Sequence, residues 1–363
     1  MIHIDGSYGE GGGQILRTSL SLAAITGRSL RIGRIRAGRQ KPGLAAQHLT
    51  AVRAAAAICQ AKVHGDFLGS TTLEFIPDGG VKPGNYTFDV TEARMGGSAG
   101  TVCLVLQTIL LPLALASECR DDTSLASTDA TCRVSTIILR GGTHVAFSPP
   151  FTYIEQVYLP TLRQMGLQAD AKLNAWGWYP QGGGEVKLQV SGGHKLSGIN
   201  LLERGDLQQV KGIAVVTGLP SHIPQRMASR AENLLHEAEL KATIQPLRER
   251  GVAPGAGLFL TAQYEHSKAG FGALGRVGLP AEKVAQLACE ELLQFHNTGA
   301  PVDEHLADQL LLPAALAKNE SQYKVAEIST HLTTNAWVIE QFGLAKVTVD
   351  EAEKIVAIAP NAD

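Results

Sequence analysis

The sequence has few cysteines, few aromatic residues and no long unbroken apolar run. Its 363 residues include five cysteines, and no two of them form a Cys-x-x-Cys pair. This scarcity argues against a zinc ribbon and favours reduced thiols in a cytoplasmic protein. The N-terminus lacks a basic start followed by an apolar core, so we expect no signal peptide. The most apolar run, 102–116, is interrupted by Gln107 and Pro112 and is shorter than the ~20 residues that span a bilayer. We expect a buried helix there and no membrane partner.

Three familiar nucleotide-binding motifs are also missing. The dipeptide Gly-Lys does not occur anywhere, which excludes a Walker P-loop. The dinucleotide fingerprint G-x-G-x-x-G fails because Gln14 stands at its third glycine, and no acidic residue follows Glu10 before Asp66. The Lys-x-Asp-Gly motif of nucleic-acid ligases is absent as well. Any nucleotide chemistry in this chain therefore uses another scaffold.

Acidic residues are absent from one long stretch, between Gly11 and Gly65, although the chain has 34 acidic and 32 basic residues in all. The local excess of positive charge suits phosphate groups, with a solvated basic surface as the plainer alternative. Arg36 and Arg39 favour phosphate binding, because they lie in the glycine-broken segment IRAGRQKPG ahead of a predicted helix. The basic residues of the stretch are Arg17, Arg28, Arg31, Arg34, Arg36, Arg39, Lys41, Arg53 and Lys62.

Strand and helix patterns alternate along the whole chain, which predicts an α/β (α+β) fold. The heptapeptide LLPLALA at Leu110–Ala116 matches LLPAALA at Leu311–Ala317 at six of seven positions. A polar residue stands five positions before each proline: Gln107 in the first copy and Asp308 in the second. The match indicates duplicated β/α units, unless it reflects only two helices rich in leucine and alanine.

The stretch 201–278 has the character of an insertion. It contains its own strand and helix patterns, whereas the segments on either side resemble each other more closely. We therefore expect a large domain of repeated units, made of 1–200 and 279–363, and a smaller inserted α/β domain at 201–278.

The segment GEGGGQILR places one carboxylate, Glu10, among four glycines. Because these glycines remove the neighbouring side chains, a large ligand can approach the backbone closely. A carboxylate in such a loop would hold a hard cation such as Mg²⁺ while arginines bind phosphate oxygens. Taken by itself, this segment is explained equally well by a glutamate in a surface turn.

The segment VAEISTHLTTNAWVIEQF changes from alternating to helical spacing near Ser329, so His331 lies where a strand leads into a helix. Ser329, Thr330 or Thr333 is available as a helix cap. A helix N-terminus favours the neutral imidazole, whose free lone pair makes it a usable nucleophile toward phosphorus. The alternative is a histidine that only forms local hydrogen bonds.

Six stretches together resemble one family, the RNA 3′-terminal phosphate cyclases. The resemblance runs from Asp5 to Asn335 in the family's order and so covers nearly the whole chain. The matching stretches are DGSYGEGGGQILR, IRAGRQKPGLAAQHL, GSAGTVCLVLQT, GWYPQGGGEV, HLADQLLLPAALA and STHLTTN. The chain departs from the family at His305, where the family often has a tyrosine that stacks on adenine.

The resemblance implies a fold and a reaction. The fold is a large domain of three repeated α/β units, similar to the C-terminal module of a bacterial translation initiation factor, with a smaller domain inserted late in the chain. In the reaction, a histidine attacks the α-phosphorus of ATP, the AMP passes to an RNA 3′-terminal phosphate, and the neighbouring 2′-hydroxyl closes a 2′,3′-cyclic phosphate. The implied partners are ATP as co-substrate, Mg²⁺ or Mn²⁺, and RNA with a 3′-terminal phosphate; a homodimer is left open.

The resemblance also assigns roles to residues. His331 matches the nucleophile and Glu10 the metal ligand, with Arg17, Arg36 and Arg39 as catalytic phosphate-site arginines. The RNA phosphate would contact Arg36, Arg39, Gln47 and His48. The ATP-binding positions are Gln107, Pro149, His305, Leu306, Ala307, Asp308 and Gln309.

Two other interpretations remain. A non-catalytic cyclase-like protein that binds RNA during ribosome assembly would have lost the nucleophile, whereas this chain keeps His331, Glu10, Arg36 and Arg39. An enolpyruvyl transferase also has repeated α/β units and an arginine-rich site, but it would not need His331.

Overall fold

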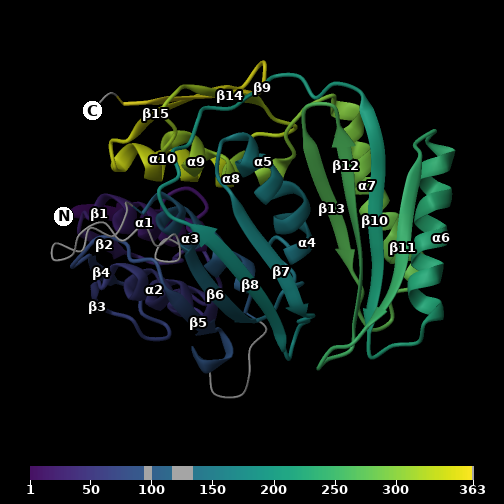
Figure 1. Ribbon diagram of the computed structural model, residues 1–363, viewed down its shortest axis with the longest axis horizontal. Helices are drawn as coiled ribbons and strands as arrows, with labels where there is room; N and C mark the ends of the chain where they lie inside the picture. The colour runs from purple at the N-terminus through teal and green to yellow at the C-terminus, as the bar shows by residue number, and fades with distance from the viewer. Residues whose placement is uncertain (94–99, 117–133, 362–363) are drawn as a thin grey trace.

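The computed structural model describes residues 1–93, 100–116 and 134–361, and Figure 1 shows their arrangement. The polar composition of 118–131 predicts a surface loop, and this segment lies outside the described residues. Within the three described ranges, four four-stranded sheets carry helices on their faces, which confirms the expected α/β fold. No helix of the described residues combines the length and apolar character that a bilayer-crossing segment needs.

The first unit, at the N-terminal end of Figure 1, pairs its strands in the order β1-β2-β4-β3. The β1 and β2 strands are parallel and the other pairs are antiparallel. The first helix ends at Gly27, whose φ of +66° makes it a left-handed C-terminal cap. The elements are β1 (Ile2–Asp5), α1 (Gly13–Thr26), β2 (Leu30–Gly33), α2 (Ala46–Cys59), β3 (Lys62–His64) and β4 (Leu73–Ile76).

The second unit repeats this topology in the order β5-β6-β8-β7, again with the first pair parallel and the others antiparallel. Its long apolar helix α3 is buried along its length, as the run 102–116 predicts. The elements are β5 (Asn85–Asp89), η1 (Thr91–Ala93), α3 (Val102–Leu115), β6 (Val134–Gly141), α4 (Phe151–Tyr153), η3 (Ile154–Tyr158), α5 (Leu159–Gln164), β7 (Ala169–Ala175) and β8 (Gly184–Ser191).

The third unit has the same strand order, β9-β14-β16-β15, with β9 parallel to β14. The duplicated heptapeptides fall on α3 and α9, which occupy equivalent places after the first strand of the second and third units. The elements are β9 (Asn200–Leu201), α8 (Glu304–Gln309), α9 (Leu311–Ala315), β14 (Ser321–Lys324), α10 (Thr330–Gln341), β15 (Ala345–Asp350) and β16 (Ile355–Pro360).

Between β9 and α8 the chain forms a further sheet, β11-β10-β12-β13, with two helices and a core of its own (Figure 1). The expected end of this insertion at 278 is too early. Apolar side chains of α7 from Ala281 to Phe295 belong to the same core, because this helix covers the inserted sheet beside α6. The elements are β10 (Leu207–Thr217), α6 (His222–Glu237), β11 (Ala242–Glu249), β12 (Gly255–Tyr264), β13 (Lys268–Leu274) and α7 (Ala281–Thr298).

A small aromatic cluster joins the inserted sheet to the second unit. Trp176 and Trp178, which follow β7, pack with Phe259 of β12 in a separate buried cluster. The buried His144 ring lies among them, 4.4 Å from the Trp176 ring and 4.8 Å from the Phe259 ring between centroids. The three repeated units share one larger core, in which α1 packs against α2, α3 and α10. The first and third units therefore meet at the N-terminal ends of α1 and α10.

Candidate active site

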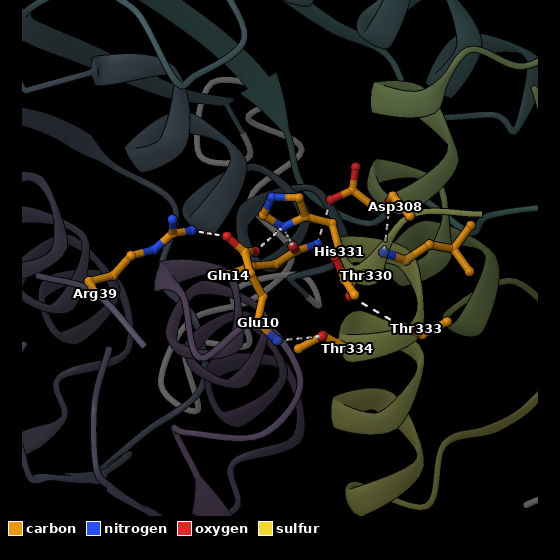
Figure 2. Close-up of polar contacts among 10 residues, drawn as sticks. Glu10, Gln14, Arg39, Asp308, Thr330, His331, Thr333 and Thr334 are labelled. Carbon is orange, nitrogen blue, oxygen red and sulfur yellow. Dashed lines mark hydrogen bonds and ion pairs between the residues drawn. The ribbon is translucent and has the colours of Figure 1, made fainter. Parts of the chain in front are cut away.

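The residues singled out in the glycine-rich loop and in the segment after β14 lie together at this junction (Figure 2). The helix α10 begins at Thr330, and its N-cap is Ser329, whose Oγ accepts a hydrogen bond of 3.2 Å from the Leu332 N–H. His331 thus occupies the first turn of α10, as the change of spacing predicts. Its side chain is 46% exposed, so it is accessible from solvent.

The glycine-rich loop lies directly against α10. Gly9 has a φ of +55°, and a Cβ at this position would stand 2.2 Å from Thr334 Oγ1, so only glycine fits. The Glu10 N–H donates to the same hydroxyl at 3.4 Å. Tyr8 stacks on Trp337 with ring centroids 4.0 Å apart. These contacts hold the loop carboxylate beside the helix that carries His331.

Glu10 contacts two of the predicted site residues. Its Oε2 lies 2.8 Å from His331 Nδ1, and its Oε1 accepts from the Arg39 guanidinium. The Glu10 side chain is 21% exposed, so the carboxylate is largely enclosed by this contact set. Glu10 lies in a turn, and the loop carries its carboxylate into a cluster of charged and polar side chains.

Gln14 completes the cluster from the first turn of α1. Its Oε1 contacts His331 Nδ1, and its Nε2 donates to Asp308 Oδ2 (Figure 2). The Asp308 backbone carbonyl accepts from the Asn335 side-chain amide at 2.8 Å, which ties α8 to α10. The residues come from α1, α8 and α10, so the site depends on the packing of the first and third units.

Charges around His331 favour its neutral form. Burial lowers its pKa, and the positive charges of Arg17 and Arg39 lower that pKa further. The helix N-terminus also favours a neutral imidazole, and the nearby guanidinium groups act in the same direction. The contact between His331 and Glu10 at neutral pH is then a hydrogen bond from the ring N–H to the carboxylate.

Arg17 and His48 lie behind the glycine-rich loop. A Cβ on Gly13 would stand 2.2 Å from His48 Nε2 and 3.2 Å from an Arg17 nitrogen, so glycine lets both side chains approach α1. Burial lowers the pKa of Arg17 to about 10, while the Asp308 carboxylate opposes that shift. Burial, together with the charges of Arg17, Arg36 and Arg39, holds the pKa of His48 well below its usual value. His48 is therefore a neutral hydrogen-bonding group at neutral pH.

Several residues of the basic stretch serve other purposes. Arg31, Arg34, Arg53 and Lys62 form ion pairs with acidic residues outside the stretch. Arg28 donates to the Phe342 carbonyl at 2.6 Å. The positive charge that reaches the site therefore comes mainly from Arg17, Arg36 and Arg39. Of these, Arg36 also donates to the Gly43 carbonyl at 2.7 Å.

Asp308 is the acidic group on the other side of Gln14. Burial raises its pKa to about 7, while the positive charge of Arg17 acts in the opposite direction. An aspartate whose pKa lies so far above its ordinary value, beside an accessible imidazole, is typical of a functional site.

The predicted adenosine-binding residues lie on α8 and around it. Gln107 of α3 donates to Gln309 at 2.8 Å, which brings two of the predicted residues together. His305 is exposed and meets the Tyr153 ring edge-on with centroids 6.3 Å apart. Pro149 is half-buried and precedes α4, the helix that carries Tyr153.

Three predicted residues do not face the cluster around His331 with their side chains. The side chains of Leu306 and Ala307 are fully buried in the main core, so only their backbone is available to a ligand. Gln47 accepts a hydrogen bond of 3.2 Å from the Thr101 N–H and so supports the start of α3.

The glycine-rich loop fits a metal ion that is held mainly by substrate phosphates and water. In the described part of the chain no three His, Cys, Asp or Glu side chains gather into a metal-binding group. Mg²⁺ commonly keeps several waters and takes one or two carboxylates together with substrate phosphates. Glu10 offers one such carboxylate, and Gly12 leaves room beside it, since a Cβ there would lie 3.2 Å from Glu10 Oε2.

The sequence patterns did not indicate Gln14 and Asp303 as parts of the site. Gln14 entered only as the residue that breaks a glycine fingerprint, although a polar residue on an apolar helix face signals a buried contact. Asp303 caps α8, and it also accepts from the Tyr153 hydroxyl at 2.7 Å. An aspartate directly before a helical segment is a cap signal that the sequence does contain.

The chain is similar to known proteins along nearly its whole length. A family model described as RNA 3′-terminal phosphate cyclase matches residues 8–349. The chain is 68% identical over 359 residues to a protein of Nostoc sp., covering 99% of both chains. It is 55% identical to one of Methylococcus capsulatus, covering 97% of this chain and 94% of the other, and 41% identical to one of Archaeoglobus fulgidus, covering 98% and 99%. All three relatives carry the name RNA 3′-terminal phosphate cyclase.

Proposed function

The chain belongs to the RNA 3′-terminal phosphate cyclase family, and we propose that it converts an RNA 3′-terminal phosphate into a 2′,3′-cyclic phosphodiester at the expense of ATP. The observation that supports this most strongly is the cluster of His331 with Glu10, Arg39 and Gln14. A neutral, accessible imidazole stands there beside the guanidinium groups that a phosphate needs. A protein that only binds RNA would not require this nucleophile.

His331 attacks the α-phosphorus of ATP in the first step. A nitrogen–phosphorus bond forms while the bond to the β-phosphate oxygen breaks, and diphosphate leaves with the electron pair. The low pKa of His331 keeps its lone pair available for this attack. Arg17 and Arg39 stand close enough to His331 to lower its pKa, so they also stabilise negative charge that develops on the phosphoryl oxygens.

AMP then passes from His331 to an oxygen of the RNA 3′-phosphate. This converts a phosphate oxygen, which is a poor leaving group, into a good one. The adjacent 2′-hydroxyl attacks the RNA phosphorus and loses its proton to solvent, the bond to AMP breaks, AMP leaves with the electron pair, and the cyclic phosphodiester forms. Because this last attack is intramolecular, effective molarity supplies much of the rate. Arg36 and Arg39, with His48 behind them, are the groups that we expect to bind the RNA phosphate.

Glu10 would hold Mg²⁺ or Mn²⁺, which would neutralise phosphate charge and polarise the phosphoryl oxygens. Gln107, Gln309, Pro149 and His305 would bind the nucleoside part of ATP. A cytoplasmic location and a homodimer stay predictions of the sequence.

A synthetic RNA with a 3′-phosphate tests the proposal. With ATP and Mg²⁺, the wild-type protein should give a cyclic end that resists phosphatase, and it should release AMP and diphosphate. The same RNA with a 3′-hydroxyl is the matched control and should stay unchanged. RNA binding without ATP consumption or cyclic product would contradict the proposal and favour the non-catalytic alternative.

A further inference from the structure

Gln14 has no role in the reaction just described, yet it is the most enclosed side chain of the cluster. Only 5% of the residue is exposed, and it lies in the first turn of α1. Its carboxamide lies between two groups of the third unit, His331 on one side and Asp308 on the other (Figure 2). A buried amide with a partner at each end has little freedom to rotate, so it can impose a direction on its neighbours.

The two ends of this carboxamide are not interchangeable. Gln14 Nε2 donates to Asp308 Oδ2, and above its pKa of about 7 the Asp308 carboxylate is ionised and only accepts hydrogen bonds, so it takes the NH₂ end of Gln14. The carbonyl end then faces His331. Asp308 itself is held in place, because Asn335 donates to its backbone carbonyl at 2.8 Å and Thr18 donates to Asn335 at 2.6 Å. The amide orientation is thus determined by a network that spans α1, α8 and α10.

An acceptor that faces His331 Nδ1 requires a hydrogen on that nitrogen. Glu10 Oε2, at 2.8 Å from the same nitrogen, is a second acceptor and requires the same. A neutral imidazole carries one ring hydrogen, so the lone pair then lies on Nε2. Within the described part of the chain, no hydrogen bond occupies Nε2.

We propose that Gln14 is a positioning residue. Asp308 fixes the orientation of its carboxamide, and the carboxamide oxygen then keeps the ring hydrogen on His331 Nδ1, so that Nε2 is the nitrogen that attacks. The inference rests on the proposed function. Glu10 cannot hold the ring hydrogen on His331 Nδ1 throughout the reaction, because its carboxylate is also the partner of Arg39 and the expected ligand of the cation. Gln14 is neutral and buried, so it would keep its contact with His331 if Glu10 bound the cation.

The same contact assists the covalent step. When Nε2 bonds to the α-phosphorus and diphosphate departs, the ring keeps its Nδ1 hydrogen and gains positive charge. The Gln14 carbonyl, backed by the Asp308 carboxylate, stabilises that charge. When AMP moves to the RNA phosphate, the nitrogen–phosphorus bond breaks and its electron pair returns to Nε2. The Nδ1 hydrogen is neither lost nor gained in either step.

Gln14→Met tests the inference, because methionine has a similar volume and offers no strong acceptor. Protein labelled with ¹⁵N at histidine is studied with Mg²⁺ and the α,β-methylene analogue of ATP, which cannot lose diphosphate. Two-bond ¹H–¹⁵N spectra distinguish the protonated ring nitrogen from the one with the lone pair, and a His331→Asn sample assigns the signal. We expect Nδ1–H in the wild type and a mixture of both tautomers in Gln14→Met.

The matched control is Gln209→Met, which breaks an amide–amide contact of 3.1 Å with Gln263 in the inserted sheet. It should change neither the tautomer of His331 nor the rate of adenylation. Gln14→Met should slow single-turnover adenylation by about 10- to 100-fold, which is the range seen when partners that orient metal-binding histidines are removed. The KM for ATP should stay nearly constant. Asp308→Asn serves as a second variant: it frees the amide to rotate and should also give mixed tautomers, even if Gln14→Met does not fold.

The results separate this inference from the proposed function. If wild-type protein forms no AMP adduct but both variants change the tautomer, the positioning role stands and the proposed function fails. If adenylation occurs while His331 keeps Nδ1–H in both variants, the positioning role is wrong. A slower adenylation with an unchanged tautomer would likewise overturn it.

Discussion

At the residue scale, the site depends on which charged side chains face one another and which are paired elsewhere. Arg34 and Arg39 illustrate the difference, because both belong to the same exposed segment and both contact a carboxylate. Arg34 pairs with Asp5 at the surface, whereas Arg39 pairs with Glu10 and lowers the pKa of His331. The glycine-broken segment 35–43 already favours Arg39 over Arg34, and the fold shows which carboxylate each of them contacts.

Arg39→Ala should therefore reduce activity far more than stability. We expect cyclisation of a 3′-phosphate end to fall by about 100-fold or more, since a cationic partner of the developing phosphoryl charge is lost. The free energy of unfolding should change by less than about 1 kcal/mol, as is usual for an exposed ion pair. Steady-state kinetics and urea unfolding measure the two effects.

Arg34→Ala is the control for that substitution, because it removes an exposed arginine of the same segment without touching Glu10 or His331. It should leave the cyclisation rate within about two-fold, as an exposed pair outside the site contributes little. Equal losses of activity and stability in Arg39→Ala would point to a structural arginine and contradict the assignment.

At the element scale, short helices are held in place by their caps. The helix α8 has six residues, too few to be stable alone, and Asp303 fixes its start. Asp303 is 3% exposed and accepts from the His305 and Leu306 N–H groups at 3.0 and 2.9 Å. It also takes the Tyr153 hydroxyl at 2.7 Å and the Gly270 N–H at 3.4 Å. One side chain thus links α8 to the second unit and to the inserted sheet.

Asp303→Ala should lower the free energy of unfolding by about 2–4 kcal/mol, because a helix cap is lost and the buried Tyr153 hydroxyl is left unpaired. The KM for ATP should rise as well, since His305 and Gln309 depend on the position of α8. Glu304→Ala is the matched control in the next position, where the side chain is exposed and should cost less than about 1 kcal/mol. Similar losses in the two variants, measured by chemical unfolding, would contradict the role given to Asp303.

At the scale of the whole molecule, the junction between the inserted sheet and the second unit contains a buried histidine. Burial lowers the pKa of His144 to about 3, so the ring is neutral in the folded protein above that pH. The unfolded chain binds a proton below its ordinary value of 6.5. The stability that depends on neutral His144 is therefore fully present above pH 6.5 and is lost progressively as the pH falls toward 3.

The wild-type protein should lose stability faster than His144→Gln as the pH is lowered through this window. Through His144, the free energy of unfolding of the wild type falls by about 1.4 kcal/mol for each pH unit below 6.5. The loss between pH 7.5 and pH 5 is about 2 kcal/mol. Trp176 and Trp178 surround His144, so their fluorescence in urea follows the relevant junction. Parallel pH dependences in the two proteins would show that His144 titrates normally in the folded state.

Much of this organisation was predictable from the sequence, and the exceptions have physical causes. Some features follow from the spacing of apolar and polar residues that are close in the sequence. These features are the α/β class, the buried helix at 102–116 and the capped turn before His331. The end of the insertion was misplaced because α7 is an amphipathic helix like any other, and only packing shows which sheet it covers. The roles of Gln14 and Asp303 depend on partners distant in the sequence, and the spacing of residues gives no measure of such contacts.

The central claim is that His331 receives AMP from ATP, and mapping the modified residue tests it most directly. Protein incubated with Mg²⁺ and ATP labelled in the α-phosphate is digested under mildly alkaline conditions, and the labelled peptide is sequenced by mass spectrometry. We predict one acid-labile AMP adduct on His331, and none in a His331→Ala variant that keeps the wild-type fold. An adduct on another residue, or a labelled His331→Ala protein, would contradict the account.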